Sequence, residues 1–212
     1  MAMRSILYFL VLVTLSLSLG LVSKTLLKGD NLLIESLSNH YNIDQVEEII
    51  NFQKKWEFTW SIFIPLVLLI KISIIAAILD AGCFLFDKTV TYSKLFRAVL
   101  IGEFIFLLPA LFKTLWFYFF QQDYTLEDLQ YFYPFSALNI VGYKEISVWW
   151  VYPLQTINVF EIVYWIVLAY LLDKTHKTPK KQNTGLKIVA SSYGVGLSIW
   201  VIGIMFFTLN NS

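Results

Sequence analysis

The chain alternates between long apolar runs and shorter polar connections. Five runs are long enough to cross the hydrocarbon core of a membrane, which takes roughly 20 mainly apolar residues in a helix. They cover about residues 6–22, 58–79, 98–120, 148–172 and 188–209. The runs are continuously apolar rather than alternating, which favours helices over the strands of a barrel. The pattern predicts an all-α polytopic membrane protein with five transmembrane helices, in which residues 1–212 form a single membrane domain embedded in a lipid bilayer.

The longest connection, residues 23–57, contains a second kind of pattern. Apolar residues recur every three or four positions over residues 43–55, which indicates an amphipathic helix. Asn42 followed by Gln45 is typical of a capping box at its start. We expect this helix to lie on the outer membrane surface or to cap the bundle, with docking of a partner as the alternative.

The connection 121–147 is also expected outside the membrane. Thr125 and Asp128 form another capping pattern, and Pro134 cannot lie deep inside a helix. These residues predict a short helix before Pro134 and another after it that ends at Gly142. The segment is too short to span, so we expect it to lie at the interface or to re-enter the membrane slightly.

The composition narrows the class of protein. Apolar residues make up 58% of the chain and charged residues only 15%, compared with about 25% charged in a soluble domain. One cysteine, Cys83, excludes an intramolecular disulfide, and with His40 and His176 as the two histidines there are too few ligands for a zinc cluster. The motifs H-E-x-x-H and G-x-S-x-G and a Gly-rich phosphate loop are absent from the sequence. We therefore expect no catalytic residues, metal, cofactor, nucleotide or nucleic acid.

The charged residues in the connections predict an orientation. If the N-terminus lies inside, nine basic residues face inside: Arg4, Lys88, Lys94, Arg97, Lys174, Lys177, Lys180, Lys181 and Lys187. Five face outside: Lys24, Lys28, Lys54, Lys55 and Lys144. The positive-inside rule then favours a cytoplasmic N-terminus and an extracytoplasmic C-terminus, in the inner membrane of a bacterium. The first run has an alternative interpretation as a cleaved signal peptide, which leaves the topology of the later spans unchanged.

Ionisable residues within the spans are the candidate functional groups. Each is expensive in lipid, so each should face the bundle. Counting residues from the outer ends of their spans places Lys71 and Glu161 at similar depth near the midplane, and we predict that they pair. Glu103 lies nearer the inner side, Asp80 near the inner boundary, and Lys113 close enough to the outer surface to snorkel. The pair would serve either as an ion- or proton-coupling site or as a structural link between helices.

Small residues recur every fourth position on two of the predicted spans. They are Ser73, Ala77 and Ala81 on the second, and Ala190, Gly194 and Ser198 on the fifth. Such stripes allow helix backbones to approach closely in a membrane. We expect them to pack the helices of one chain, with a homodimer interface as the alternative.

Several segments together resemble a known family. The segments YFYPFSALNIVG, WWVYPLQTINVFEIVYWIVLAYLL and GLKIVASSYGVGLSIWVIG, within five spans over residues 50–209, resemble the bacterial branch of the Yip (Ypt-interacting protein) family. The resemblance implies a five-helix membrane bundle. Eukaryotic relatives contact small GTPases through a cytosolic N-terminal region that carries a D-L-Y-G-P motif. This chain lacks the motif, so GTPase binding is not carried over.

Three functions follow as hypotheses from these patterns. The first is a non-enzymatic scaffold, accessory subunit or membrane-organising factor, with another membrane protein or a second copy as partner. The second is a transporter or permease component that uses Lys71, Glu161 and Glu103 as coupling groups. An intramembrane enzyme is the third, and it is disfavoured because no catalytic constellation is present.

Overall fold

A computed structural model describes residues 2–38, 41–175 and 184–211, and in these ranges the protein is helical with no strand. The predicted all-α class is confirmed. The α-helices are α1 (Ala2–Leu26), α2 (Gly29–Ser38), α3 (Ile43–Leu85), α4 (Tyr92–Gly102), α5 (Leu107–Phe119), α6 (Leu126–Tyr131), α7 (Ala137–Val141), α8 (Val148–Thr156), α9 (Val159–Thr175), α10 (Thr184–Val189) and α11 (Val195–Asn211). A 3-10 segment, η1 (Glu103–Phe106), joins α4 to α5, and a π-helical segment, η2 (Ala190–Gly194), joins α10 to α11.

Four helical segments in the described part of the chain are long and apolar enough to cross a membrane. They are Met3–Leu26, Ser61–Leu85, Tyr92–Phe119 and Thr184–Asn210, and they coincide with four of the five predicted spans. The remaining prediction, one helix over 148–172, is corrected: α8 ends at Thr156 and α9 begins at Val159. α9 has 17 residues and, with α8, replaces the single predicted helix. The break arises at Asn158, whose side chain makes capping hydrogen bonds to both helices.

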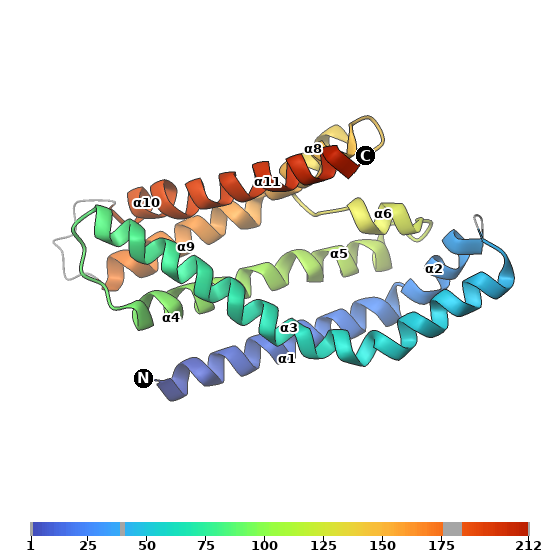
Figure 1. Ribbon diagram of the computed structural model, residues 1–212, viewed down its shortest axis with the longest axis horizontal. Helices are drawn as coiled ribbons and strands as arrows, with labels where there is room; N and C mark the ends of the chain where they lie inside the picture. The colour runs from blue at the N-terminus through green and yellow to red at the C-terminus, as the bar shows by residue number, and fades with distance from the viewer. Residues whose placement is uncertain (1, 39–40, 176–183, 212) are drawn as a thin grey trace.

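The long helices run side by side, and the two termini lie at opposite ends of the bundle (Figure 1). The connection between α3 and α4 lies at the N-terminal end, whereas α2 and α6 lie toward the end that holds the C-terminus. Of the lysine-rich inner connection, residues 176–183 lie outside the described part of the chain, as do both histidines. The arrangement separates the predicted inside and outside connections, while their orientation across a membrane stays a prediction.

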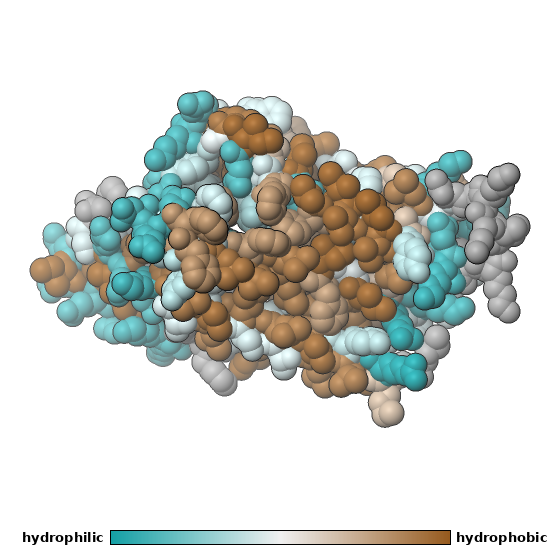
Figure 2. All heavy atoms as spheres, turned by 180° about the vertical axis from the view of Figure 1, so that it is seen from behind, coloured by the Kyte–Doolittle hydropathy of each residue, from teal (hydrophilic) through white to brown (hydrophobic). Residues whose placement is uncertain are grey.

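An apolar surface, here called the apolar belt, lies across the middle of the molecule. Figure 2 shows hydrophobic side chains over the centre of one face, with most hydrophilic ones toward the two ends. Large apolar side chains such as Ile70, Ile166 and Ile199 are at least half exposed. Apolar surfaces of this kind mark sites of contact with a membrane or another protein, and together with four helical segments of spanning length they indicate a membrane protein.

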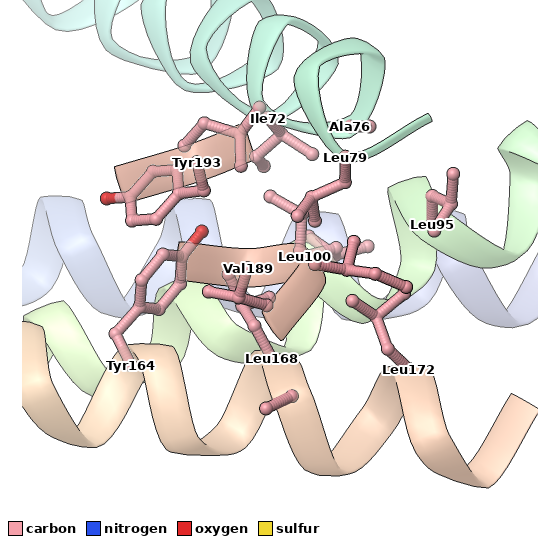
Figure 3. Close-up of a cluster of buried hydrophobic side chains, with 14 of the residues drawn as sticks. Ile72, Ala76, Leu79, Leu95, Leu100, Tyr164, Leu168, Leu172, Val189 and Tyr193 are labelled. Atoms are coloured by element: carbon pink, nitrogen blue, oxygen red, sulfur yellow. The ribbon is translucent and has the colours of Figure 1, made fainter. Parts of the chain in front are cut away.

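The packed core lies between α3, α4, α9 and the α10–η2 segment (Figure 3). Ile72, Ala76 and Leu79 of α3 face Leu168 and other side chains of this core, all of them buried. The rest of the labelled set is Leu95, Leu100, Tyr164, Leu172, Val189 and Tyr193. The packing of these side chains fixes which side of each span faces the core.

The predicted small-residue stripes are only partly used. Ala77 and Ala81 of α3 are exposed, as are Ala190 and Ser198, while Ser73 is half-buried. Of the predicted set, Gly194 packs closely, because a Cβ there would lie 2.5 Å from the Trp165 ring. The close approach of α3 to η2 instead uses Gly82, where a Cβ would lie 2.5 Å from Ser192 Oγ.

The predicted amphipathic helix is the start of α3, not a separate element. Its capping box is present, with the Asn42 backbone N–H donating to Gln45 Oε1 at 3.2 Å. Nothing between residues 55 and 61 breaks the helix, so α3 runs for 43 residues, about 65 Å at 1.5 Å per residue. It is therefore far longer than a membrane is thick. Figure 1 shows that α3 bends along its length, and the helix contains Pro65, a residue that kinks helices.

The second predicted connection is confirmed in its local structure. α6 begins with the Thr125–Asp128 capping box, and α7 ends before Gly142, whose φ is +85°. The turn between them, residues 132–136, reaches the break between α8 and α9. The Ala137 N–H donates to the Ile157 carbonyl at 2.9 Å, and the Val159 N–H donates to the Phe135 carbonyl at 3.2 Å. The turn thereby satisfies backbone groups that the helix break leaves unpaired, as irregular backbone in a membrane requires.

Candidate functional site: a polar cluster among the spans

Six polar or aromatic side chains form a connected group among the spans, here called the polar cluster. Its members are Lys71 from α3, Glu103 from η1, Glu161, Tyr164 and Trp165 from α9, and Tyr193 from η2. Lys71 lies ten residues after the start of the Ser61–Leu85 span, about 15 Å along a helix axis. Lys71 is therefore near the middle of a segment long enough to span, the position at which a charge is most expensive in lipid.

Lys71 forms its ion pair with Glu103. Its Nζ lies 2.7 Å from Glu103 Oε2 and 4.3 Å from the centre of the Phe106 ring. The Glu103 side chain is 2% exposed, whereas that of Lys71 is 42% exposed. This corrects the predicted pair of Lys71 with Glu161. Glu103 was expected nearer the inner side, but the structure places it level with Lys71, while the Glu161 carboxylate instead accepts from Trp165 and Tyr193.

Tyr164 links Glu103 to α9 by a hydrogen bond. Its hydroxyl donates to Glu103 Oε1 at 3.2 Å, and its side chain is fully buried. The ring fits against Gly102, because a Cβ on that glycine would lie 2.7 Å from Tyr164 Cε2. A glycine next to the buried glutamate is what allows the two spans to approach closely enough for this hydrogen bond.

Glu161 occupies the first turn of α9, where a helix N-terminus favours negative charge. Its backbone N–H donates to Asn158 Oδ1 at 2.8 Å. Its Oε1 atom accepts from Trp165 Nε1 at 2.9 Å and from the Tyr193 hydroxyl at 2.8 Å. Two donors therefore orient the carboxylate toward η2.

The aromatic rings close the cluster between its two carboxylates. The Tyr164 and Tyr193 rings are 5.4 Å apart edge to face, and those of Trp165 and Tyr193 are 6.0 Å apart. Figure 3 shows Tyr164 and Tyr193 approaching each other from α9 and η2. The chain of contacts runs from Lys71 through Glu103, Tyr164 and Tyr193 to Glu161. It holds one basic group and two acidic groups.

Three departures from regular α-helix in the described part of the chain lie at the polar cluster. The 3-10 segment begins at Glu103, the π-helical segment contains Tyr193, and the break at Asn158 lies three residues before Glu161. Mid-helix 3-10 and π segments commonly mark functional positions. Their coincidence singles out this cluster from the rest of the core.

The other predicted ionisable residues lie apart from the cluster. Asp80 is exposed toward the end of α3, and Lys113 is half-buried on α5. Within the described ranges, neither forms an ion pair within 4 Å. The structure thus brings together Lys71, Glu103 and Glu161, but not Asp80 or Lys113.

Sequence reasoning missed the aromatic members of the cluster. Tyr164 and Trp165 follow Glu161 by three and four residues, so they lie on the same helix face. Hydroxyl- and N–H-bearing rings beside an intramembrane carboxylate are a usable signal, since each supplies a donor. Tyr193 carried no comparable signal, because its approach depends on how η2 packs.

No protein-family model matches the chain, and neither a curated protein nor a solved structure shows significant similarity to it. The interpretation of the polar cluster therefore rests on its geometry and its charge.

Proposed function

We propose that the protein is a membrane transport component in which the polar cluster takes up and releases a proton or a monovalent cation. The observation that carries the proposal is the imbalance of charge. Lys71 neutralises Glu103 at 2.7 Å, whereas Glu161 is a second carboxylate that has hydrogen-bond donors but, among the described residues, no basic partner within 4 Å.

An unpaired carboxylate in a membrane is unfavourable, by about 2.5–3.5 kcal/mol at the centre of a span on insertion scales. One bound proton or monovalent cation on Glu161 would bring the cluster to neutrality. The Trp165 and Tyr193 donors stabilise the ionised form, while the apolar surroundings favour the neutral one. A group with two accessible protonation states is the basic requirement for coupling.

The backbone around Glu161 supports the same function. Transporters commonly place their sites at discontinuous helices near the midplane. The α8–α9 break at Asn158 is such a discontinuity, and the turn before α7 supplies its backbone partners.

The direct test is proton flux into liposomes that contain the purified protein and an internal pH-sensitive dye, driven by a potassium diffusion potential. Wild-type protein should acidify the lumen, and Glu161→Gln should reduce the rate to that of protein-free vesicles. Glu127→Gln, which removes an exposed carboxylate outside the spans, should leave the rate unchanged.

Tyr193→Phe provides a second variant for the same assay. It removes one donor to Glu161 but keeps the ring, so it should shift the pH at which the flux is half-maximal without abolishing it. No flux from wild-type protein under protons, sodium or potassium gradients would overturn the proposal, and so would unchanged flux in Glu161→Gln.

A second candidate function is that of an accessory subunit or scaffold in a membrane complex. It is favoured by the Lys71 side chain, which is 42% exposed in the middle of a span. A partner helix or a second copy covering this side chain would remove it from lipid. A photo-cross-linker at Ile70, which is 50% exposed, should then capture a discrete product in native membranes. A cross-link to lipid alone would count against a complex.

The proposal also covers the membrane, the orientation of the chain and the number of spans. We place the protein in the inner membrane of a bacterium, with its N-terminus cytoplasmic and α8 and α9 together crossing as a fifth, broken span. We also propose that the chain is related to the bacterial branch of the Yip family. It is supported by the helical bundle and by the sequence segments that carry the resemblance.

A further inference from the structure

A large cavity lies at the other end of α5 from the polar cluster. Its volume is about 850 Å³, within the range of about 300–1,000 Å³ that is usual for small-molecule sites. Its walls come from the C-terminal half of α5, from α6 and α7, and from the start of α9. It does not include any member of the polar cluster, so it calls for an explanation of its own.

The walls of the cavity are mostly aromatic and aliphatic. Phe112 and Trp116 of α5 stand on one side, Phe135 on the turn before α7, and Ile162 on α9. Their exposed fractions are 44%, 43%, 59% and 59%. The cavity is therefore open along the apolar belt rather than sealed inside the bundle, and a hydrocarbon chain could enter it from the side.

The other part of the cavity is polar and belongs to the connection after α5. Asp128 is the one charged residue of its lining, together with neutral groups such as Gln121 and Asn139. The Asp128 carboxylate accepts from the Thr125 N–H at 3.0 Å and from the Tyr143 hydroxyl at 2.8 Å. The backbone N–H of Thr125, aided by the Tyr143 hydroxyl, lowers the pKa of Asp128 below its usual value. The carboxylate therefore carries its negative charge at neutral pH.

We propose that this cavity binds one phospholipid with an amine headgroup, whose acyl chain lies along Phe112, Trp116 and Ile162 and whose ammonium lies near Asp128. The cavity joins an apolar wall at span level to a negative group in the connection, which is the polarity of such a lipid from tail to head. Lys144 Nζ lies nearby, 5.5 Å from the centre of the Tyr143 ring, but outside the lining, so inside the cavity an anionic headgroup would meet the Asp128 charge without a compensating base. Charge therefore selects phosphatidylethanolamine over phosphatidylglycerol.

Native mass spectrometry of the detergent-solubilised full chain tests this directly. The protein is mixed with equal amounts of phosphatidylethanolamine and phosphatidylglycerol of the same acyl composition, and retained adducts are counted. We expect one adduct, at least threefold enriched in phosphatidylethanolamine. Asp128→Asn should remove the enrichment, whereas Glu127→Gln, one residue away and outside the lining, should keep it.

A second pair of variants tests the apolar part. Ile162→Trp should fill the cavity and remove the adduct. Ile166→Trp, one turn further along α9 at a similarly exposed position outside the lining, should retain it. Both variants keep the helix surface apolar, and thermal unfolding in detergent checks that both are folded before their adducts are compared.

Three results would overturn the proposal. One is equal retention of both lipids by wild-type protein, and another is an adduct that survives Ile162→Trp. The third is a stable dimer in the mass spectrum of the wild type that is absent for Ile162→Trp. That result would mean that a second copy of the chain covers the cavity. Proton flux is measured separately, so failure of lipid binding leaves the proposed coupling at Glu161 as it stands.

Discussion

Lys71 Nζ lies 2.7 Å from Oε2 of Glu103, and the two residues come from different spans, 32 positions apart in the chain. The glutamate is almost fully buried, while the lysine is partly exposed. The pair therefore joins α3 to η1 and fixes the rotation of both helices about their axes. The other carboxylate oxygen of Glu103, Oε1, accepts from the Tyr164 hydroxyl, which adds α9 to the same contact.

Removing one charge of this pair should destabilise the protein more than removing both charges. Lys71→Met leaves Glu103 buried and unpaired, and we expect a loss of about 1–3 kcal/mol in the free energy of unfolding, below the full cost of a buried pair because Lys71 is partly exposed. The double variant Lys71→Met with Glu103→Gln should recover part of that loss. Thermal unfolding in detergent measures it. Equal stability of the wild type and both variants would contradict a structural role for the pair.

Gly102 offers a test of the contact between α4 and α9. In Gly102→Ala the new Cβ would meet Tyr164 Cε2 at 2.7 Å, so the ring must move away from Glu103. Overpacking of this kind typically destabilises by about 1–3 kcal/mol. Gly20→Ala is the matched control, because a Cβ there meets nothing within 4 Å, and alanine should favour the helix. A stabilised Gly102→Ala would show that the two spans do not pack as described.

The local features of the fold were the most predictable from sequence. The Thr125–Asp128 capping box, Pro134 and Gly142 bracket two short helices because each acts on its own backbone neighbours. The rotation of the spans was not predictable in this way. In a membrane both faces of a helix are apolar, so hydropathy does not separate buried Ala76 from exposed Ala77. The partner of Lys71 depended on that rotation, which brings Glu103 rather than Glu161 within 2.7 Å of its Nζ atom.

Asn158 should be essential to that break. Its Oδ1 atom accepts from the Glu161 N–H, while its Nδ2 donates to the carbonyls of Gln155 and Thr156. Asn158→Ala removes all three bonds and should cost at least the ~1 kcal/mol of a lost cap. Asn158→Ser keeps a short, uncharged side-chain acceptor for the Glu161 N–H and should cost less. Limited proteolysis and thermal unfolding would rank the variants, and a Ser variant as unstable as the Ala variant would show that the cap on α9 is not what matters.

Asp128 and Tyr143 predict how the outer segment responds to pH. The lowered pKa of Asp128 contributes stability that is present above its unfolded pKa of about 3.9 and is lost as pH falls through the folded value. Partial burial and donation to Asp128 raise the pKa of Tyr143 to about 12. Its contribution is therefore complete below about pH 10 and is lost as pH rises toward 12.

Ultraviolet absorbance of the phenolate measures the second of these effects. Subtracting the titration of Tyr143→Phe from that of the wild type isolates this one tyrosine. The difference should titrate near pH 12 in the wild type and closer to pH 10, the ordinary value for tyrosine, in an Asp128→Asn background. A difference curve already centred near pH 10 in the wild type would mean that the Tyr143–Asp128 hydrogen bond does not form in solution.

The orientation of the bundle is open to a direct measurement with single cysteines. Cys83 is buried, so Cys83→Ser gives a background in which Lys88→Cys and Lys144→Cys each provide one reactive thiol. These positions lie in the connection after α3 and in the connection after α7, at opposite ends of the bundle (Figure 1). If the positive-inside bias sets the topology, a membrane-impermeant maleimide added to intact cells should label Lys144→Cys and spare Lys88→Cys until the membrane is permeabilised. The reverse pattern would place the N-terminus outside, and labelling of both in intact cells would mean that the two ends of the bundle are not on opposite sides of the membrane.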